Sequence, residues 1–201
     1  MYKVIEVKQS IFEDNNKDAV LLRQECKEKG VFLLNIMSSP GSGKTTTLSR
    51  TIVDAHTISQ YGVRTIQLHT GGMCHLDADM TRQGLHELGM ENLDLAVLEN
   101  VGNLVCPAEF DTGSSLNIAI LSVPEGDDKP LKYPLMFEVC DVVLINKVDV
   151  LPYFDFDIEK CKENIHYRNK NAKVFEICAK SGEGVKSWCD YLLTRIREWK
   201  E

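Results

Sequence analysis

SSPGSGKTT, residues 38–46, follows the apolar run VFLLNIM at 31–37 and precedes a stretch with the pattern of a helix. A short continuous apolar run is typical of a strand buried inside a parallel sheet. Glycines at two positions would let the backbone curl until several N–H groups face one anion, and a helix start adds its dipole. The order of strand, glycine turn, lysine, threonine and helix favours a phosphate-binding loop of the Walker A type.

The side chains of this loop suggest their roles. Lys44 would reach the β- and γ-phosphates of a nucleotide, and the Thr45 hydroxyl would ligate Mg²⁺. The general pattern GxxxxGK[ST] has a glycine where this chain has Ser38, so a glycine turn capped by a threonine is the simpler alternative. If the loop binds phosphate, its other members are Gly41, Ser42, Gly43 and Thr46.

Outward from the loop, hydrophobic patterning predicts strands that alternate with helices. The expected strands are 31–37, 63–69, 93–99, 117–124, 141–147 and 172–178. The expected helices are 14–29, a stretch from the phosphate loop to near Gly62, 75–88, 131–140, 157–170 and 183–200. This alternation indicates an α/β fold, with a mostly parallel sheet covered by helices on both faces. Ligands of such sheets bind at the carboxyl ends of the strands.

Composition narrows the class of protein. The 201 residues fit a single domain, and the net charge of −7 argues against a general binder of nucleic acid or anionic membranes. No apolar run is as long as a membrane span, and the charged N-terminus is not of the secretory type. Seven cysteines without a CxxC pair suggest reduced thiols in the cytoplasm.

NKVD, residues 146–149, ends the fifth expected strand. After a phosphate loop, such a motif would let Asp149 accept hydrogen bonds from guanine N1–H and N2–H₂, which adenine does not offer. Asn146 and Lys147 complete the motif. CAKSGEG at 178–184 is similar to the SAK-type loop of GTPases, in which the Ala179 N–H would meet guanine O6 beside Lys180. Taken alone, NKVD also fits an ordinary turn.

ENVG, residues 99–102, ends the third expected strand. It occupies the place of the DxxG loop of GTPases, with Glu99 near Mg²⁺ and the Gly102 N–H near the γ-phosphate. An ordinary strand-to-loop turn is the alternative.

GGMCHLDADM, residues 71–80, places Cys74 beside His75. Thiol, imidazole and carboxylates in one run suit a transition metal. They also suit a helix start, with acidic residues near the positive end of the dipole. A Cys-His pair supplies two ligands, whereas a protein site usually needs more, so the residues leave both alternatives open.

Six segments in one order carry a resemblance: SSPGSGKTT, TGGMCHLDADM, ENVGNLVCPAEFDTG, LSVPEGDDKPLKYP, LINKVDVLPY and SGEG. From about residue 15 to 198 the chain resembles the HypB family, the nickel-inserting GTPases that help mature [NiFe] hydrogenases. The resemblance implies a SIMIBI-class P-loop GTPase of one domain over 1–201, with a helical extension at about 1–30. It implies GTP with Mg²⁺, a homodimer that depends on GTP or GDP, and a HypA-type metallochaperone and the hydrogenase large subunit as partners.

The resemblance also implies that Cys74, His75 and Cys106 form a Ni²⁺ or Zn²⁺ site near the dimer interface. Three ligands from each subunit, doubled across a two-fold axis, are enough to hold either metal. The other cysteines and histidines have no motif, and the cysteines are expected to be small buried hydrophobes.

The chain departs from the family in several places. Gly72 stands where many members have a lysine, and the N-terminal CxxCGC and His-rich motifs are absent. Between Arg50 and Asp54 about 30 residues are missing, roughly one βαβ unit, which would carry switch I and an aspartate near Mg²⁺. Either the polypeptide lacks this piece or the natural chain is longer here. A metal-storage module with an inactive nucleotide site is therefore the alternative function. The urease-maturation GTPases are a more distant alternative, because they have a Cys-Pro-His motif instead of CHLDA.

Overall fold

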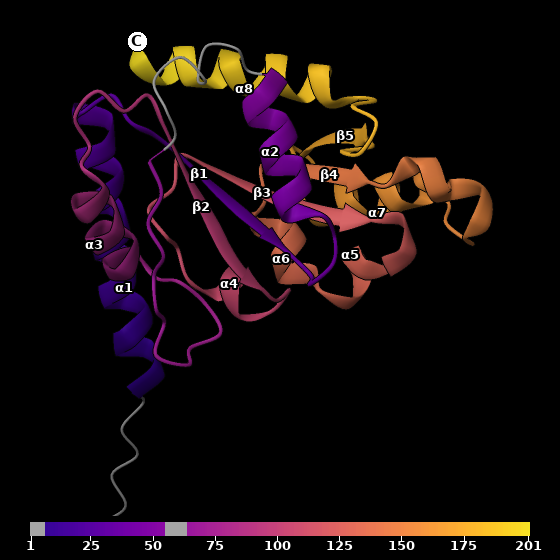
Figure 1. Cartoon of the computed structure of the whole chain (residues 1–201). Helices are drawn as coiled ribbons and strands as arrows, with labels where there is room; N and C mark the ends of the chain where they lie inside the picture. Colours follow the sequence, from indigo (N-terminus) through magenta and orange to yellow (C-terminus); the bar gives the residue numbers. More distant parts are fainter. Residues whose placement is uncertain (1–6, 55–63) are drawn as a thin grey trace, which may run out of the picture.

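The computed structural model describes residues 7–54 and 64–201. Within these ranges one parallel sheet has five strands in the order β2-β1-β3-β4-β5 (Figure 1). The strands are β1 (Phe32–Ser38), β2 (Leu95–Gly102), β3 (Leu116–Ser122), β4 (Val142–Asn146) and β5 (Lys173–Ile177). The helices are α1 (Val7–Glu28), α2 (Lys44–Asp54), α3 (Ala78–Leu88), α4 (Cys106–Glu109), α5 (Lys129–Lys132), α6 (Pro134–Val139), α7 (Ile158–Arg168) and α8 (Val185–Lys200), with 3-10 turns η2 (Val123–Glu125) and η3 (Val148–Tyr153).

Helices cover both faces of the sheet, as predicted. One face packs against α2 and α8, and the other packs against α1 and α3 at one end and α6 and α7 at the other (Figure 1). The central strands β1 and β4 are buried along their whole length, which explains their continuous apolar sequences. Because every strand pair is parallel, all five carboxyl ends lie on one edge of the sheet.

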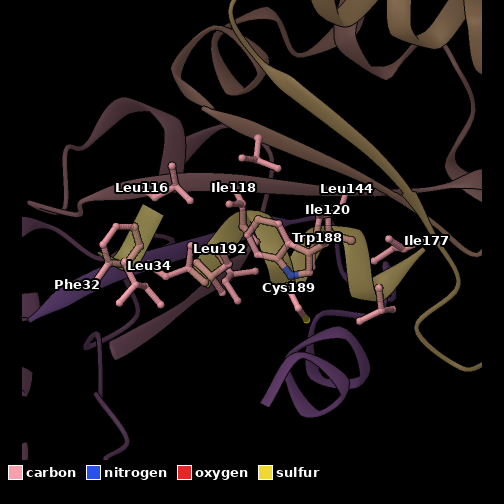
Figure 2. Packing of buried hydrophobic residues seen from close by; sticks show 14 residues of the cluster. Phe32, Leu34, Leu116, Ile118, Ile120, Leu144, Ile177, Trp188, Cys189 and Leu192 are labelled. Atoms are coloured by element: carbon pink, nitrogen blue, oxygen red, sulfur yellow. The ribbon is translucent and has the colours of Figure 1, made fainter. Parts of the chain in front are cut away.

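Trp188 of α8 anchors the first face of the core. Its side chain is 1% exposed, and its indole N–H donates to the Thr51 hydroxyl of α2 over 3.1 Å. A buried indole N–H without a partner would cost free energy, so this bond fixes α8 against α2. Figure 2 shows Trp188 among side chains from neighbouring strands, including Ile118, Ile120 and Leu144.

The predicted strand 63–69 is wrong for its described part. Residues 64–70 have no regular secondary structure, and the sheet has five strands within the described ranges where six were expected. The alternation of VRTIQLH favours a strand, but a strand also needs a neighbour to pair with.

Several helices begin or end at other residues than the sequence predicts. The first helix begins at Val7, earlier than expected, and α3 begins at Ala78, because Asp77 caps it by accepting from the Met80 N–H. The single helix expected over 131–140 is two short helices that meet at Tyr133, because the residue before a proline is disfavoured in helical conformation. The expected end of the helix near Gly62 lies outside the described residues, whereas α2 is described to Asp54.

None of the described helices combines the length and apolar character that crossing a membrane requires.

Candidate nucleotide and metal sites

The phosphate loop joins the carboxyl end of β1 to α2, which begins at Lys44. The Lys44 ammonium donates to the Ser38 hydroxyl over 3.0 Å, and the buried Ser42 hydroxyl lies 2.7 Å from the same oxygen. Ser38, the departure from the general Walker pattern, thus holds the loop and its lysine together. The loop faces the edge where ligands of parallel sheets bind.

Asn146 joins the phosphate loop to the expected base pocket. Its side-chain amide donates to the Ser42 carbonyl over 2.9 Å, and its carbonyl accepts from the Ala179 N–H over 3.1 Å. The side chain is 2% exposed, so both bonds are shielded from water. The Ala179 N–H, predicted to meet guanine O6, is therefore engaged by Asn146 in this structure.

Gly43 makes this arrangement possible. A Cβ at this position would lie 2.5 Å from the Asn146 amide nitrogen, and the backbone φ is +98°. Lys147 adds a second link, because its ammonium donates to the Gly41 carbonyl over 2.8 Å. Asn146 and Lys147 of NKVD are therefore hydrogen-bonded to the phosphate loop, although about 100 residues separate the two motifs in the sequence.

The remaining base-pocket residues lie around this joint. Asp149 is exposed and lies in η3, directly after the carboxyl end of β4. The Arg50 guanidinium of α2 donates to the carbonyls of Ala179 and Lys180, over 3.3 and 2.8 Å. The helix that begins at the phosphate loop therefore also holds the base loop in place.

The two side chains predicted as Mg²⁺ ligands lie close together. The Thr45 hydroxyl lies 3.5 Å from the Glu99 carboxylate, and both residues are exposed. A Cβ on Gly102 would lie 3.5 Å from the Lys44 ammonium nitrogen, so the ENVG backbone reaches the phosphate loop. A carboxylate and a hydroxyl beside a phosphate loop fit Mg²⁺, which prefers few protein oxygens together with phosphate and water. Thr46 is also exposed, in the first turn of α2.

The two predicted cysteine ligands come together from different loops. Cys74 precedes α3 and is exposed, whereas Cys106 is the first residue of α4 and is half-buried. Interaction with the Cys106 side chain raises the pKa of the Cys74 thiol above its usual value, so the two cysteines lie near one another. The imidazole of His75 lies 4.0 Å from the Cys74 sulfur, but its ring stacks on Phe110 with centroids 3.7 Å apart. Among the described residues, no group of three or more such side chains could hold a metal ion.

Two buried asparagines, which the sequence interpretation missed, bind the backbone of the segment that follows Cys74 and His75. Asn100 at the end of β2 accepts from the Leu76 N–H over 3.3 Å and from the Val101 N–H over 2.8 Å. Asn15 of α1 accepts from the Ala78 N–H over 3.0 Å. The signal in the sequence is a polar residue at a position where the hydrophobic pattern expects burial.

The other five cysteines are all buried, as predicted: Cys26, Cys140, Cys161, Cys178 and Cys189. Burial raises the pKa of Cys26 to about 11 and that of Cys161 to about 12. The Cys26 and Cys161 thiols therefore stay protonated at neutral pH and, being buried, are poor metal ligands, because a metal binds the thiolate.

Comparison with known proteins places the chain in a family. The CobW/HypB/UreG nucleotide-binding domain matches residues 48–176. The hydrogenase maturation factor HypB of Azotobacter chroococcum is 42% identical, covering 94% of this chain and 68% of its own length. HypB of Escherichia coli K12 is 40% identical, covering 96% of this chain and 73% of its own length. The Azotobacter alignment extends over 211 positions, more than the 201 residues here, so that relative has residues without a counterpart in this chain.

Two solved structures have the same fold. HypB from Helicobacter pylori in complex with nickel has a TM-score of 0.83 at 36% identity, covering 92% of this chain and 96% of that one. HypB from Archaeoglobus fulgidus has a TM-score of 0.82 at 34% identity, covering 92% and 99%. Together with the phosphate loop, the NKVD joint and the thiol pair, these matches show that the chain belongs to the HypB family of hydrogenase maturation factors, among the CobW/HypB/UreG nucleotide-binding proteins.

Proposed function

We propose that the chain is a GTP-hydrolysing switch that delivers nickel during the maturation of [NiFe] hydrogenases. The observation that carries the proposal is the position of β2. Its carboxyl end brings Glu99 and Gly102 to the phosphate loop, and the chain then runs directly to Cys106 beside Cys74. Three residues lie between Gly102, the last residue of β2, and Cys106, the first residue of α4, so a change at one site can reach the other through a short piece of backbone.

The nucleotide side of the proposal assigns a task to each residue. GTP with Mg²⁺ supplies the phosphoryl group and the cation that neutralises it. Lys44 and the backbone N–H groups of the loop stabilise charge on the phosphates, while Thr45 and Glu99 offer oxygens to the cation. Asp149 selects guanine through its carboxylate. None of these residues is an evident catalytic base, so slow turnover without a partner is expected.

The metal side treats Ni²⁺ as cargo. The two thiols of one subunit, with His75, fill part of a coordination shell, and a symmetric partner subunit doubles the donors. Zn²⁺ accepts the same donor types, so it is the competing metal. We propose that GTP and GDP favour different homodimer arrangements, and that a HypA-type metallochaperone and the hydrogenase large subunit lie before and after this step in the cytoplasm. By linkage, nickel must change nucleotide affinity by the same factor that nucleotide changes nickel affinity.

The second candidate function is a metal-storage module whose nucleotide site is inactive. It is favoured by the missing piece after Arg50, where the family resemblance expects switch I. The Azotobacter relative, with more aligned positions than this chain has residues, is consistent with such a loss. An intact-mass measurement decides whether the piece is absent: 22.7 kDa supports a shortened chain, and a clearly larger mass refutes it.

GTP hydrolysis, measured with and without Ni²⁺, separates the two functions. A switch turns over GTP, loses turnover in Lys44→Ala, and changes its rate or its nucleotide affinity when Ni²⁺ binds. A storage module binds Ni²⁺ with no GTP turnover above that of Lys44→Ala. Equal Ni²⁺ affinity in the presence and absence of GTP would contradict the coupling between the sites.

A further inference from the structure

The loop of residues 178–184 leaves the sheet beside NKVD. Strand β5, which precedes this loop, pairs in parallel with β4, and Ile177 lies opposite Asn146 in the register. The loop is tightly folded, because the Cys178 N–H donates to the Glu183 carbonyl over 2.9 Å. Since the two loops start from paired strand ends, a base bound by NKVD would also face the loop of residues 178–184.

Arg50 of α2 binds two carbonyls of this loop with one guanidinium group. Its Nε–H donates to the Ala179 carbonyl over 3.3 Å, and its Nη2–H donates to the Lys180 carbonyl over 2.8 Å. Arg50 is half-buried, so water competes with these bonds only in part. A planar guanidinium presents its donors in a rigid fork, and it therefore fixes the orientation of two successive peptide groups.

The orientation of these carbonyls determines where the neighbouring N–H groups point. Every described peptide bond is trans, and in a trans peptide the carbonyl and the N–H of the next residue point in opposite directions. Because the Ala179 carbonyl faces Arg50, the Lys180 N–H points away from α2. The Lys180 carbonyl directs the Ser181 N–H away from α2 in the same way.

Two of the three N–H groups in this turn have partners within the loop and the adjoining motif. The Ala179 N–H donates to the Asn146 side-chain carbonyl over 3.1 Å, and the Ser181 N–H lies 3.4 Å from the Cys178 sulfur. The Lys180 N–H has no such partner in the described part of the chain. It is therefore the N–H of this turn that remains available to a ligand.

Arg50 also makes the Lys180 N–H a stronger donor. A hydrogen bond from a cation polarises the Ala179 carbonyl, and hydrogen bonds to one end of a peptide group strengthen those made at its other end. Guanine presents an acceptor, O6, where adenine presents an amino group that only donates. A polarised N–H at this place therefore favours guanine over adenine.

We propose that Arg50 is a specificity-determining positioning residue, which directs and polarises the Lys180 N–H so that it donates to guanine O6. Arg50 does not touch the base and acts through the peptide group between Ala179 and Lys180. This inference rests on the proposed function for the guanine nucleotide and extends it, because guanine is then selected by a second contact besides Asp149. Arg50 and Lys44 lie in the same helix, so α2 would link base selection to phosphate binding.

The test compares GDP with 6-thio-GDP by calorimetry. The thio analogue keeps the guanine N1–H and N2–H₂ donors but has a weakly accepting sulfur in place of O6. Arg50→Met should weaken GDP binding about tenfold and 6-thio-GDP binding much less, because the displaced N–H loses a strong acceptor only in GDP. Arg50→Lys keeps the charge without the fork and should fall between Arg50→Met and the parent. A merely structural role of Arg50 would weaken both nucleotides equally.

Arg64→Met is the matched control for Arg50→Met. Arg64 also donates to two backbone carbonyls, those of Leu88 and Glu91, over 3.3 and 3.2 Å, but it does so at the end of α3. The control removes the same charge and the same number of carbonyl contacts, so it should keep the parental affinity for GDP.

The amide proton of Lys180 gives a second measurement, by NMR, which needs no variant and so remains decisive if Arg50→Met does not fold. GDP should move this resonance downfield, and 6-thio-GDP should move it less. Equal shifts with both nucleotides, equal losses of GDP and 6-thio-GDP affinity in Arg50→Met, or equal GDP affinity in Arg50→Met and Arg64→Met would overturn the inference alone. A parent protein that binds ADP as tightly as GDP would instead refute guanine selection in the proposed function, and this inference with it.

Discussion

Gly43→Ala tests the joint between the phosphate loop and the base pocket. The new Cβ would lie 2.5 Å from the Asn146 amide nitrogen, a separation that real Cβ atoms do not adopt, so Asn146 must move. Moving it breaks the bonds to the Ser42 carbonyl and from the Ala179 N–H, both in a region closed to water. Gly41→Ala is the matched control, because Gly41 also has a positive φ, +77°, but nothing lies within 4 Å of its added Cβ.

The expected losses of unfolding free energy differ between the two variants. A left-handed backbone conformation costs a residue with a Cβ about 1–2 kcal/mol, and both variants bear this cost. Gly43→Ala adds a buried group without its partner, about 1–3 kcal/mol, and a lost hydrogen bond of about 1 kcal/mol. The total is about 3–6 kcal/mol for Gly43→Ala against about 1–2 kcal/mol for Gly41→Ala, a large part of the 5–15 kcal/mol that stabilises a typical domain.

Urea unfolding followed by circular dichroism measures both losses, and a double-mutant cycle isolates the cause. In an Asn146→Ala background the clash is gone, so Gly43→Ala should cost only the backbone term of about 1–2 kcal/mol. Equal losses for Gly43→Ala and Gly41→Ala, or an unchanged cost of Gly43→Ala in the Asn146→Ala background, would refute the proposed joint.

Three other predictions concern the ligands. Asp149→Asn should weaken GTP binding 10- to 1000-fold, about 1.4 to 4 kcal/mol, because an amide matches the guanine donors poorly; titration with GTP and ATP measures it, and equal binding of both by the parent protein would contradict guanine selection. Lys44→Ala should abolish GTP turnover and retain Ni²⁺ binding in a metal titration, so loss of both would show that the sites are not separable. Cys74→Ala and Cys106→Ala should each remove most Ni²⁺ binding, whereas His75→Ala should change metal preference more than affinity; light scattering should also show that metal favours the dimer. A Cys106→Ala protein with parental Ni²⁺ affinity would rule out the shared thiol site.

Much of the fold could be predicted because most strands are defined by burial alone. The apolar runs at β1 and β4 are buried on both faces, so their composition identifies them without knowledge of their neighbours. The phosphate loop and NKVD could be predicted with them, since each begins at the end of such a strand. The strand predicted for VRTIQLH is wrong for the opposite reason. Its alternation is typical of a half-buried strand, but a cavity separates its described residues from β2, the strand with which they would have to pair. A local pattern carries no information about whether a pairing partner exists.

The residues of the candidate site are predictions from the sequence, whereas the contacts between them come only from the structure. Spacing and resemblance predict roles for Lys44, Asp149 and Cys106, because the type of each side chain already indicates the ligand that it could bind. The role of Asn146 in joining two loops depends on contacts across about 100 residues of sequence, and so does the stacking of Phe110 on His75. Such contacts appear only when the sheet brings its carboxyl ends together.

Strand β2, which carries Glu99 and Gly102, is hydrogen-bonded to a neighbouring strand on one side only within the described residues, and this affects how easily it can move. On its inner side β2 pairs with β1, and near its end Asn100 accepts from the Leu76 N–H, in the loop that carries Cys74 and His75. On its outer side the described chain provides no strand. The register with β1 also shifts between Ile36 and Ser38, opposite Glu99 and Gly102, so the ladder is least regular where β2 meets the phosphate loop. An edge strand with an irregular end moves at lower cost than a central one, because fewer hydrogen bonds must break. If the proposed function holds, the end of β2 is the element that would carry a change at the phosphates to Cys74 and Cys106, and Ni²⁺ affinity measured with and without GTP tests this.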